Sequence, residues 1–182
     1  ILLIVAGIYL GTLCAGVYPG ASGEATGQAL GLVPVTAAGH ALAFAAARLV
    51  AALSPGDAPF FLNLATALCG SVVAVLLFRA AKGFILELTR PAPDIYAQPD
   101  VTDEPARRND GVSEEARVSA ATLGGVLSVL VAVFSAPFWR ASTSFSTHPT
   151  DTVLLLLLVL SLLRCLSSGN KIACVTAMFL SG

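Results

Sequence analysis

The sequence predicts an all-α, polytopic membrane protein, and three observations support this fold class. The 182 residues are 56% hydrophobic and only 12% charged, so the chain is about half as charged as a typical soluble domain. Several apolar stretches approach the roughly 20 residues that a helix needs to cross a bilayer. Most acids lie in one stretch between these apolar blocks. The sequence therefore has no general basic surface, and we expect no nucleic-acid partner.

Four stretches are apolar enough, or nearly so, to be transmembrane helices, because only closed backbone hydrogen bonding is stable in hydrocarbon. They are residues 1–17, 60–78, 118–138 and 152–166. A fifth apolar stretch begins at residue 172 and runs to residue 182. The chain starts at an isoleucine and stops in or just after an apolar run, so we expect it to be part of a longer protein with a single membrane domain.

Residues 37–53 are ambiguous, because they are apolar overall but contain His40 and Arg48. Arginines and lysines gather after the second predicted span, before the third and after the fourth. This pattern marks those sides as cytoplasmic. If residues 37–53 crossed the bilayer, the basic segment between the second and third spans would be outside. We therefore expect an interfacial helix at 37–53, one external loop over residues 18–59, and a cytoplasmic N-terminus.

The segment between the second and third spans, residues 91–115, contains four prolines and many acids. Such a composition cannot bury enough apolar surface to fold by itself. The sequence therefore predicts an acidic, mobile cytoplasmic linker at this position.

The predicted external regions carry the polar side chains that are best placed for chemistry. Glu24, at the start of a short predicted helix, can be a general base, a metal ligand or a partner of the helix dipole. Asp151 is either the N-terminal cap of the fourth span, with His148 a solvated neighbour, or part of a site. A site would be formed by residues that all face the outer surface and can converge on a lipid-linked phosphate and an acceptor, namely Glu24, His40, Arg48, Arg140, His148 and Asp151.

Other features are neutral or exclude classes of function. Asn63 lies near the outer end of the second span, where an amide usually bonds to a neighbouring helix or loop. Trp139 and Arg140 fit ordinary interface anchors at the end of the third span. The chain has no Walker loop, dinucleotide fingerprint, zinc-binding spacing or nucleophile elbow, which excludes most classes of soluble enzyme.

Several short motifs follow one another in a fixed order along the chain. They are Tyr9 and Thr12, Gly-Ala-Ser-Gly-Glu at 20–24, Leu30-Gly31, Gly39 with Leu42, Asn63 followed by Leu64 and Ala67, and the pair Phe138-Trp139. In this order they resemble a family of polytopic glycosyltransferases, the protein O-mannosyltransferase-like group often described as a domain of unknown function within the GT-C superfamily. The resemblance covers most of the chain outside the acidic linker.

The resemblance implies a GT-C-like bundle in the plasma membrane, with interfacial helices in the first external loop. It implies transfer of mannose or another hexose from a polyprenyl-phosphate donor to a serine or threonine hydroxyl of a protein acceptor on the outer face. Glu24 and Asp151 would be the catalytic acids. Substrate would be bound by His40, Arg48, Asn63, Arg140 and His148. No resident cofactor is implied, and a divalent metal stays an open option that no residue pattern supports.

Two departures from the family pattern bear on catalysis. Ala21 stands where the family has an aspartate, its expected base, and residues 35–41 replace a His-Pro-Pro-Gly-Tyr-Pro stretch. An alanine cannot accept a proton from an acceptor hydroxyl. Either Glu24 or Asp151 performs the acid–base work, or the chain is a non-catalytic relative that binds a lipid-linked sugar or acts as a membrane assembly partner. A small-solute transporter is less favoured, because no charged mid-membrane helix and no repeated half is evident.

Overall fold

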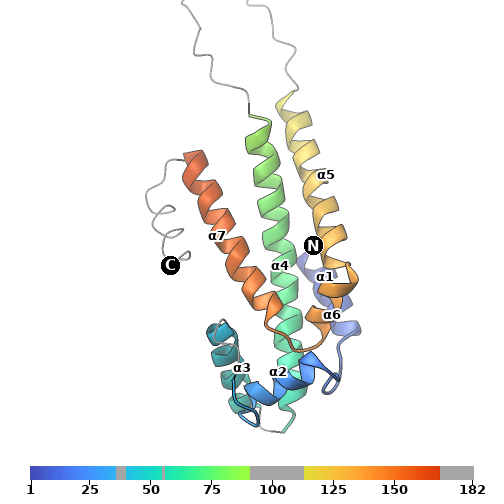
Figure 1. Ribbon diagram of the computed structural model, residues 1–182. Helices are drawn as coiled ribbons and strands as arrows, with labels where there is room; N and C mark the ends of the chain where they lie inside the picture. Colours follow the sequence, from blue (N-terminus) through green and yellow to red (C-terminus); the bar gives the residue numbers. More distant parts are fainter. Residues whose placement is uncertain (36–39, 55, 91–112, 169–182) are drawn as a thin grey trace, which may run out of the picture.

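The computed structural model describes residues 1–35, 40–54, 56–90 and 113–168. Within these residues the chain forms helices and no strands, which confirms the predicted all-α class. The helices are α1 (Leu2–Gly11), α2 (Ala21–Ala29), α3 (Ala41–Leu53), α4 (Ala58–Leu88), α5 (Glu114–Val133), α6 (Ala136–Thr143) and α7 (His148–Ser168). The long helices α4, α5 and α7 form a bundle, and the shorter α2, α3 and α6 gather where α4 begins (Figure 1).

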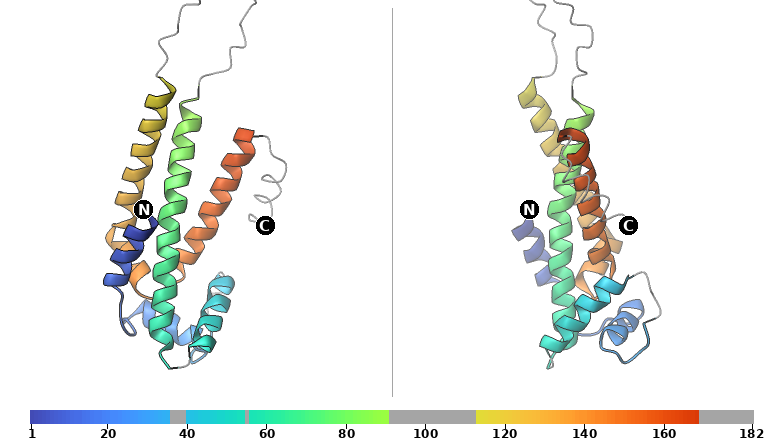
Figure 2. Two further views of the ribbon diagram at one scale, coloured as in Figure 1. Left: turned by 180° about the vertical axis from the view of Figure 1, so that it is seen from behind. Right: turned by 90° about the vertical axis from the view of Figure 1, so that its left-hand side faces the viewer.

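Helix α4 is the centre of the bundle and contacts α1, α3, α5, α6 and α7. Views from two further directions show α5 and α7 flanking it (Figure 2). Its 31 residues begin after Asp57, with a proline in the first turn, a position where the missing N–H costs nothing. At 1.5 Å per residue α4 is about 46 Å long, which exceeds the roughly 30 Å of bilayer hydrocarbon.

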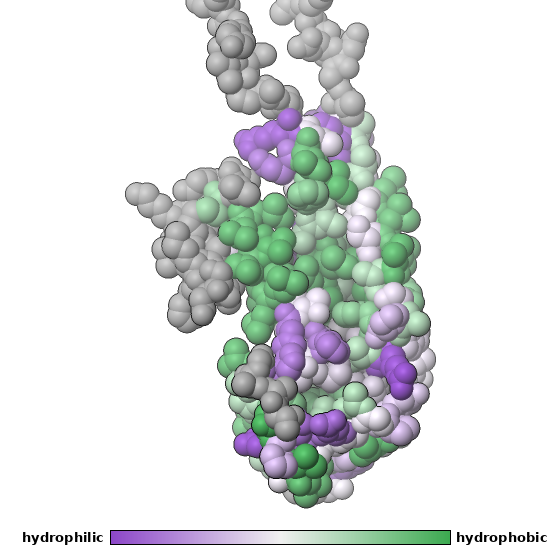
Figure 3. Space-filling model, in the orientation of Figure 1, coloured by the Kyte–Doolittle hydropathy of each residue, from purple (hydrophilic) through white to green (hydrophobic). Residues whose placement is uncertain are grey.

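Among the residues that the structure describes, three helices are long and apolar enough to cross a membrane, namely α4, α5 and residues His148–Cys165 of α7. Large apolar side chains on the bundle are exposed, including Leu3, Leu123 and Val131. In the space-filling view an apolar zone separates two regions where hydrophilic residues gather (Figure 3). This distribution is typical of a membrane protein, in which the apolar zone contacts lipid.

The first predicted span differs from the helix found there. Helix α1 has 10 residues and ends at Gly11, so at 1.5 Å per residue it is about 15 Å long. It stops because the backbone that follows is held by other groups. The N–H of Cys14 donates to the carbonyl of Thr143 at 3.0 Å, which draws residues 12–17 towards the end of α6 and away from a helical path.

The predicted span at 118–138 is divided into two helices. Helix α5 ends at Val133, and α6 begins two residues after Phe134 with a proline in its first turn. A proline ring cannot continue a helix interior, because it removes one N–H and clashes with the preceding turn. The predicted fourth span starts earlier than expected, since α7 begins at His148 rather than at residue 152.

The acidic linker is shorter at its end than the sequence predicts. Its last two glutamates form the first turn of α5, where carboxylates are stabilised by the helix dipole. The Oγ of Ser113 accepts the N–H of Ala116 at 3.2 Å and caps this helix. The rest of the predicted linker, residues 91–112, and the predicted fifth span from residue 172 lie outside the described residues.

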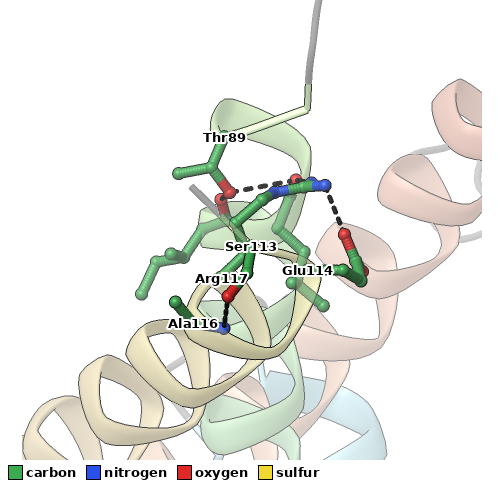
Figure 4. Close-up of polar contacts among 7 residues, drawn as sticks. Thr89, Ser113, Glu114, Ala116 and Arg117 are labelled. Carbon is green, nitrogen blue, oxygen red and sulfur yellow. Dashed lines mark hydrogen bonds and ion pairs between the residues drawn. The ribbon is translucent and has the colours of Figure 1, made fainter. Parts of the chain in front are cut away.

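One arginine ties the start of α5 to the end of α4. Figure 4 shows the Arg117 side chain beside Thr89, with its guanidinium close to Glu114. Its Nη1 donates to Oε2 of Glu114 at 2.6 Å, and its Nη2 donates to the carbonyl of Leu86 at 3.2 Å. The Leu86 contact provides a partner to a carbonyl in the last turn of α4, where intrahelical donors run out.

Helix α1 packs closely against α4 and α6. Tyr9 is fully buried, its hydroxyl donates to the carbonyl of Val133 at 2.8 Å, and its ring meets Trp139 edge-on at 5.7 Å. Gly70 makes this packing possible. A Cβ at position 70 would lie 2.6 Å from Oγ of Ser142 and 3.0 Å from the Tyr9 ring, so any other residue would require the Ser142 and Tyr9 side chains to shift.

Helix α3 corresponds to the helix predicted at 37–53, although residues 36–39 lie outside the described residues. Its inner face carries Phe44 and Ala47, which pack against Leu62 of α4. Its outer face carries apolar side chains that are exposed, namely Leu42, Leu49 and Leu53. A helix with an apolar inner face and leucines facing outward is suited to lie against lipid.

Candidate functional site

Helices α2, α3 and α6 and the loops next to them lie around the N-terminal end of α4 (Figure 1). We call this part of the protein the cap. Asn63 lies at its centre and is 2% exposed. Its Nδ2 donates to the carbonyls of Cys14 and Gly16, both at 2.8 Å. Its Oδ1 accepts the N–H of Phe145 at 2.7 Å. The amide predicted to bind substrate is thus used to fix the loops after α1 and α6.

A pocket of about 280 Å³ lies between these two loops, and we call it the cap pocket. Arg140 and His148, both predicted site residues, line it together with Tyr18 and Ser22. They come from the turn before α2, the first turn of α2, the last turn of α6 and the first residue of α7. One cation, one imidazole and several hydroxyls therefore share a single cavity at the surface of the cap.

Arg140 is positioned by its helix and by Tyr18. It lies in the last turn of α6, where a cation is favoured by the helix dipole. Its guanidinium carbon lies 4.8 Å from the centre of the Tyr18 ring, which is within cation–π range. The backbone carbonyl of Arg140 accepts a hydrogen bond from Oγ of Ser144 at 2.9 Å. The positive charge is held at the pocket wall without a carboxylate partner among the described ion pairs.

Helix α2 brings Ala21 and Ser22 to the pocket. The helix ends in a Schellman motif, in which Leu32 N–H donates to the Gly27 carbonyl at 2.9 Å and Gly31 has φ +76. Only glycine adopts this left-handed conformation at little cost. The Ser22 hydroxyl is buried beside the pocket and has no hydrogen-bond partner among the described residues, so its hydrogen-bonding capacity is unused in this structure. Ala21 also lines the pocket.

Glu24 lies outside this lining. It is exposed in the first turn of α2, and its Oε1 accepts from Nε2 of Gln28 at 3.3 Å. Residues three apart lie on the same face of a helix. Glu24 is therefore one turn from Ala21 on the exposed face of α2.

His40 and Asp151 form a second group, which joins the start of α3 to the first turn of α7. His40 Nδ1 lies 2.8 Å from Asp151 Oδ2. The same nitrogen has no aligned hydrogen-bond partner among the described residues, so the two atoms are close without a directed hydrogen bond. Asp151 is not the cap of its helix, because α7 begins at His148. Both side chains are more than a third exposed (35% and 37%), which limits the strength of the pair.

Arg48 is separated from both groups. It is exposed on α3 and lines a shallow groove with Leu30 and Ala52. Within the described parts of the chain, no three His, Cys, Asp or Glu side chains come together as metal ligands. The predicted outer site is thus divided into the cap pocket, the His40–Asp151 pair and two isolated charges.

Sequence reasoning missed two of the pocket residues, Tyr18 and Ser22. Both belong to the Pro-Gly turn and the Ser-Gly-Glu motif that the sequence does single out. Their neighbours Ser144 and Ser146 also line the pocket. No sequence signal distinguishes these serines from other polar residues near a span, because their place depends on how α6 folds back.

No family model matches this chain, and no curated protein or solved structure is significantly similar to it.

Proposed function

We propose that this chain is a multi-pass membrane protein whose cap lies on the outer face, and that its cap pocket binds the phosphate of a polyprenyl-phosphate-linked sugar. The single observation that carries the proposal is the presence of Arg140, His148 and the unpartnered Ser22 hydroxyl in one cavity. A guanidinium pairs with phosphate oxygens through two parallel hydrogen bonds. An imidazole and a hydroxyl add donors to the same group.

The arrangement of charge supports this orientation. The end of the bundle opposite the cap carries basic residues, including Arg79, Lys82, Arg90 and Arg117. Basic residues flanking transmembrane helices favour the cytoplasmic side. The cap then lies outside, in the plasma membrane, and the exposed leucines of α3 rest at the outer surface of the bilayer.

Two functions, binding without catalysis and sugar transfer, both require that the donor binds. A non-catalytic relative would bind a lipid-linked sugar, or assemble with a membrane partner, and needs only the pocket. Among the described residues, the pocket lining contains no carboxylate, which is why we put binding first. In this function the phosphate lies against Arg140, and the polyprenyl chain extends into the bilayer beside the bundle.

Transfer of the sugar to a serine or threonine hydroxyl of a protein acceptor is the second candidate. It is favoured by the position of Glu24, which shares the exposed face of α2 with the pocket residue Ala21. A carboxylate one helical turn from a bound donor can take a proton from an acceptor hydroxyl. Asp151, which contacts His40, would then act only through the orientation of α3 and α7.

Titration of the purified protein in nanodiscs with a labelled polyprenyl-phosphate hexose tests the proposal. We expect Arg140→Ala to weaken binding by roughly 10- to 100-fold, the loss of a charge-assisted hydrogen-bond pair. Arg48→Ala is the comparison, because it removes the other external arginine and leaves the pocket intact. The proposal fails if Arg48→Ala weakens binding and Arg140→Ala does not.

Transfer is tested separately with Glu24→Gln in membranes that contain donor and an acceptor peptide. Retained binding with lost transfer assigns the base to Glu24. Unchanged transfer removes Glu24 from the mechanism, and no transfer by the unaltered chain favours the non-catalytic binder.

A further inference from the structure

A second cavity lies between α4 and α7, towards the end opposite the cap. It has a volume of about 440 Å³, and we call it the α4–α7 cavity. Helix α4 contributes Arg79, Gly83 and Glu87, and α7 contributes Leu160, Leu163 and Arg164. Residues four apart lie on one face of a helix. Two facing stripes, each with an arginine, therefore form its walls.

Arg79 lies near the level at which α4 leaves the hydrocarbon. About twenty residues from Ala58 cover roughly 30 Å, and Arg79 lies just beyond this length. Beyond Arg79 the helix continues with the exposed apolar residues Phe84 and Leu88. The guanidinium is therefore at the boundary between hydrocarbon and headgroups, where an anionic headgroup can reach it.

The cavity exists because α4 has a glycine where the two helices face each other. A Cβ at Gly83 would have Cδ1 of Leu163 as its nearest neighbour, at 3.8 Å, which is ordinary contact distance. Glycine is therefore not required for close packing here. Its effect is to leave open a space that most side chains would fill.

The basic and the apolar residues of the cavity lining together indicate the class of ligand. We propose that the α4–α7 cavity binds the phosphate headgroup of an anionic phospholipid from the bilayer, with Arg79 at the phosphate and an acyl chain along Leu160 and Leu163. The one acid of the lining, Glu87, has its own cation, since its Oε1 lies 3.4 Å from Nη1 of Arg90. Basic cavities between transmembrane helices on the cytoplasmic side are suited to anionic headgroups.

We favour a lipid over free phosphate because half of the residues in the lining have no charge and two of them are leucines on a bundle with exposed apolar side chains. The site requires that α4 and α7 cross the bilayer. It does not depend on what the cap pocket binds.

Native mass spectrometry of the purified full chain in detergent tests this site with phosphatidylglycerol and phosphatidylcholine of the same acyl chains. We expect the protein to retain phosphatidylglycerol at least tenfold more strongly. Arg79→Gln should abolish this preference, whereas Lys82→Gln, which removes a neighbouring charge outside the lining, should leave it. Gly83→Leu fills the cavity without changing any charge and should also abolish the preference, with Gly83→Ala causing a smaller loss.

Equal retention of the two lipids by the unaltered chain would overturn the proposal, and so would a preference that survives both Arg79→Gln and Gly83→Leu. If Arg79→Gln does not fold, Gly83→Leu alone decides. Inorganic phosphate at millimolar concentration is the second arm. Displacement of phosphatidylglycerol by inorganic phosphate would assign the cavity to a free anion and overturn the lipid assignment.

Discussion

The side-chain oxygen of Asn63 accepts the backbone N–H of Phe145 at 2.7 Å, across 82 positions of sequence. The nitrogen of the same amide donates to two carbonyls of the loop after α1. One buried side chain thus satisfies backbone groups of both loops that border the cap pocket. Asparagine suits this position because its amide has both donors and acceptors.

Asn63→Ala should lower the free energy of unfolding by about 2–4 kcal/mol, because it leaves buried backbone groups without partners. Asn63→Asp should also destabilise, since a carboxylate keeps the contact with Phe145 but cannot donate to the carbonyls of Cys14 and Gly16. Thermal unfolding in detergent measures both. The control is Thr66→Val, one turn along α4, whose hydroxyl bonds only within its helix, to the Leu62 carbonyl. Equal unfolding temperatures for the Asn63 and Thr66 variants would contradict this role.

Two glycines of α4 should respond in opposite directions to the same change. Gly70→Ala places a methyl against Ser142 and Tyr9 and should destabilise by about 1–3 kcal/mol through overpacking. Gly83→Ala has room for its methyl and should be neutral or stabilise by up to about 1 kcal/mol, from helix propensity. Thermal unfolding of the matched pair is the measurement. No loss for Gly70→Ala would contradict the close approach of α1, α4 and α6 at Gly70, and a loss for Gly83→Ala would contradict the space beside Gly83.

The sequence predicts the helical class and the long apolar helices because a long run of apolar residues is visible in the sequence itself. It places the helix at 37–53 from charge balance, and α3 occupies most of that range. The contact of Asn63 with Phe145 and the division of residues 118–138 are not predictable in this way. Both depend on α6 folding back onto α4. A local sequence pattern cannot predict a contact between residues that are 82 positions apart.

The candidate site is predicted less well than the fold. Arg140 and His148 share the cap pocket as expected from their place in one external turn. Arg48 and Glu24 lie outside the pocket lining, because residues of one outer surface can point to different sides of the cap. Hydropathy predicts the spans and the placement of basic residues predicts the side of the membrane, but neither shows which residues share a cavity.

The contact between His40 and Asp151 should contribute little to stability. A pair that is more than a third exposed is expected to be worth under about 1 kcal/mol. A double-mutant cycle with His40→Gln and Asp151→Asn, followed by thermal unfolding, gives the coupling directly. A coupling above about 2 kcal/mol would indicate a tighter pair than the geometry supports.

Tyr18 should affect donor binding through Arg140. Tyr18→Ala removes the ring beneath the guanidinium and should weaken binding of the polyprenyl-phosphate hexose roughly two- to fivefold, as a half-exposed cation–π contact of about 0.5–1 kcal/mol implies. Tyr18→Phe keeps the ring and should bind nearly as well as the unaltered chain. If Tyr18→Phe is as weak as Tyr18→Ala, the hydroxyl rather than the ring face is the contributing group.

The central claim is that α4 crosses the membrane with the cap outside. An epitope inserted after Gly56, before α4 begins, and another inserted after Arg90, where it has ended, test this claim in intact and permeabilised cells. The account predicts that antibody reaches the epitope at Gly56 in intact cells and the epitope at Arg90 only after permeabilisation. Labelling of both epitopes in intact cells, or of neither, would mean that both ends of α4 lie on one side and would contradict the account.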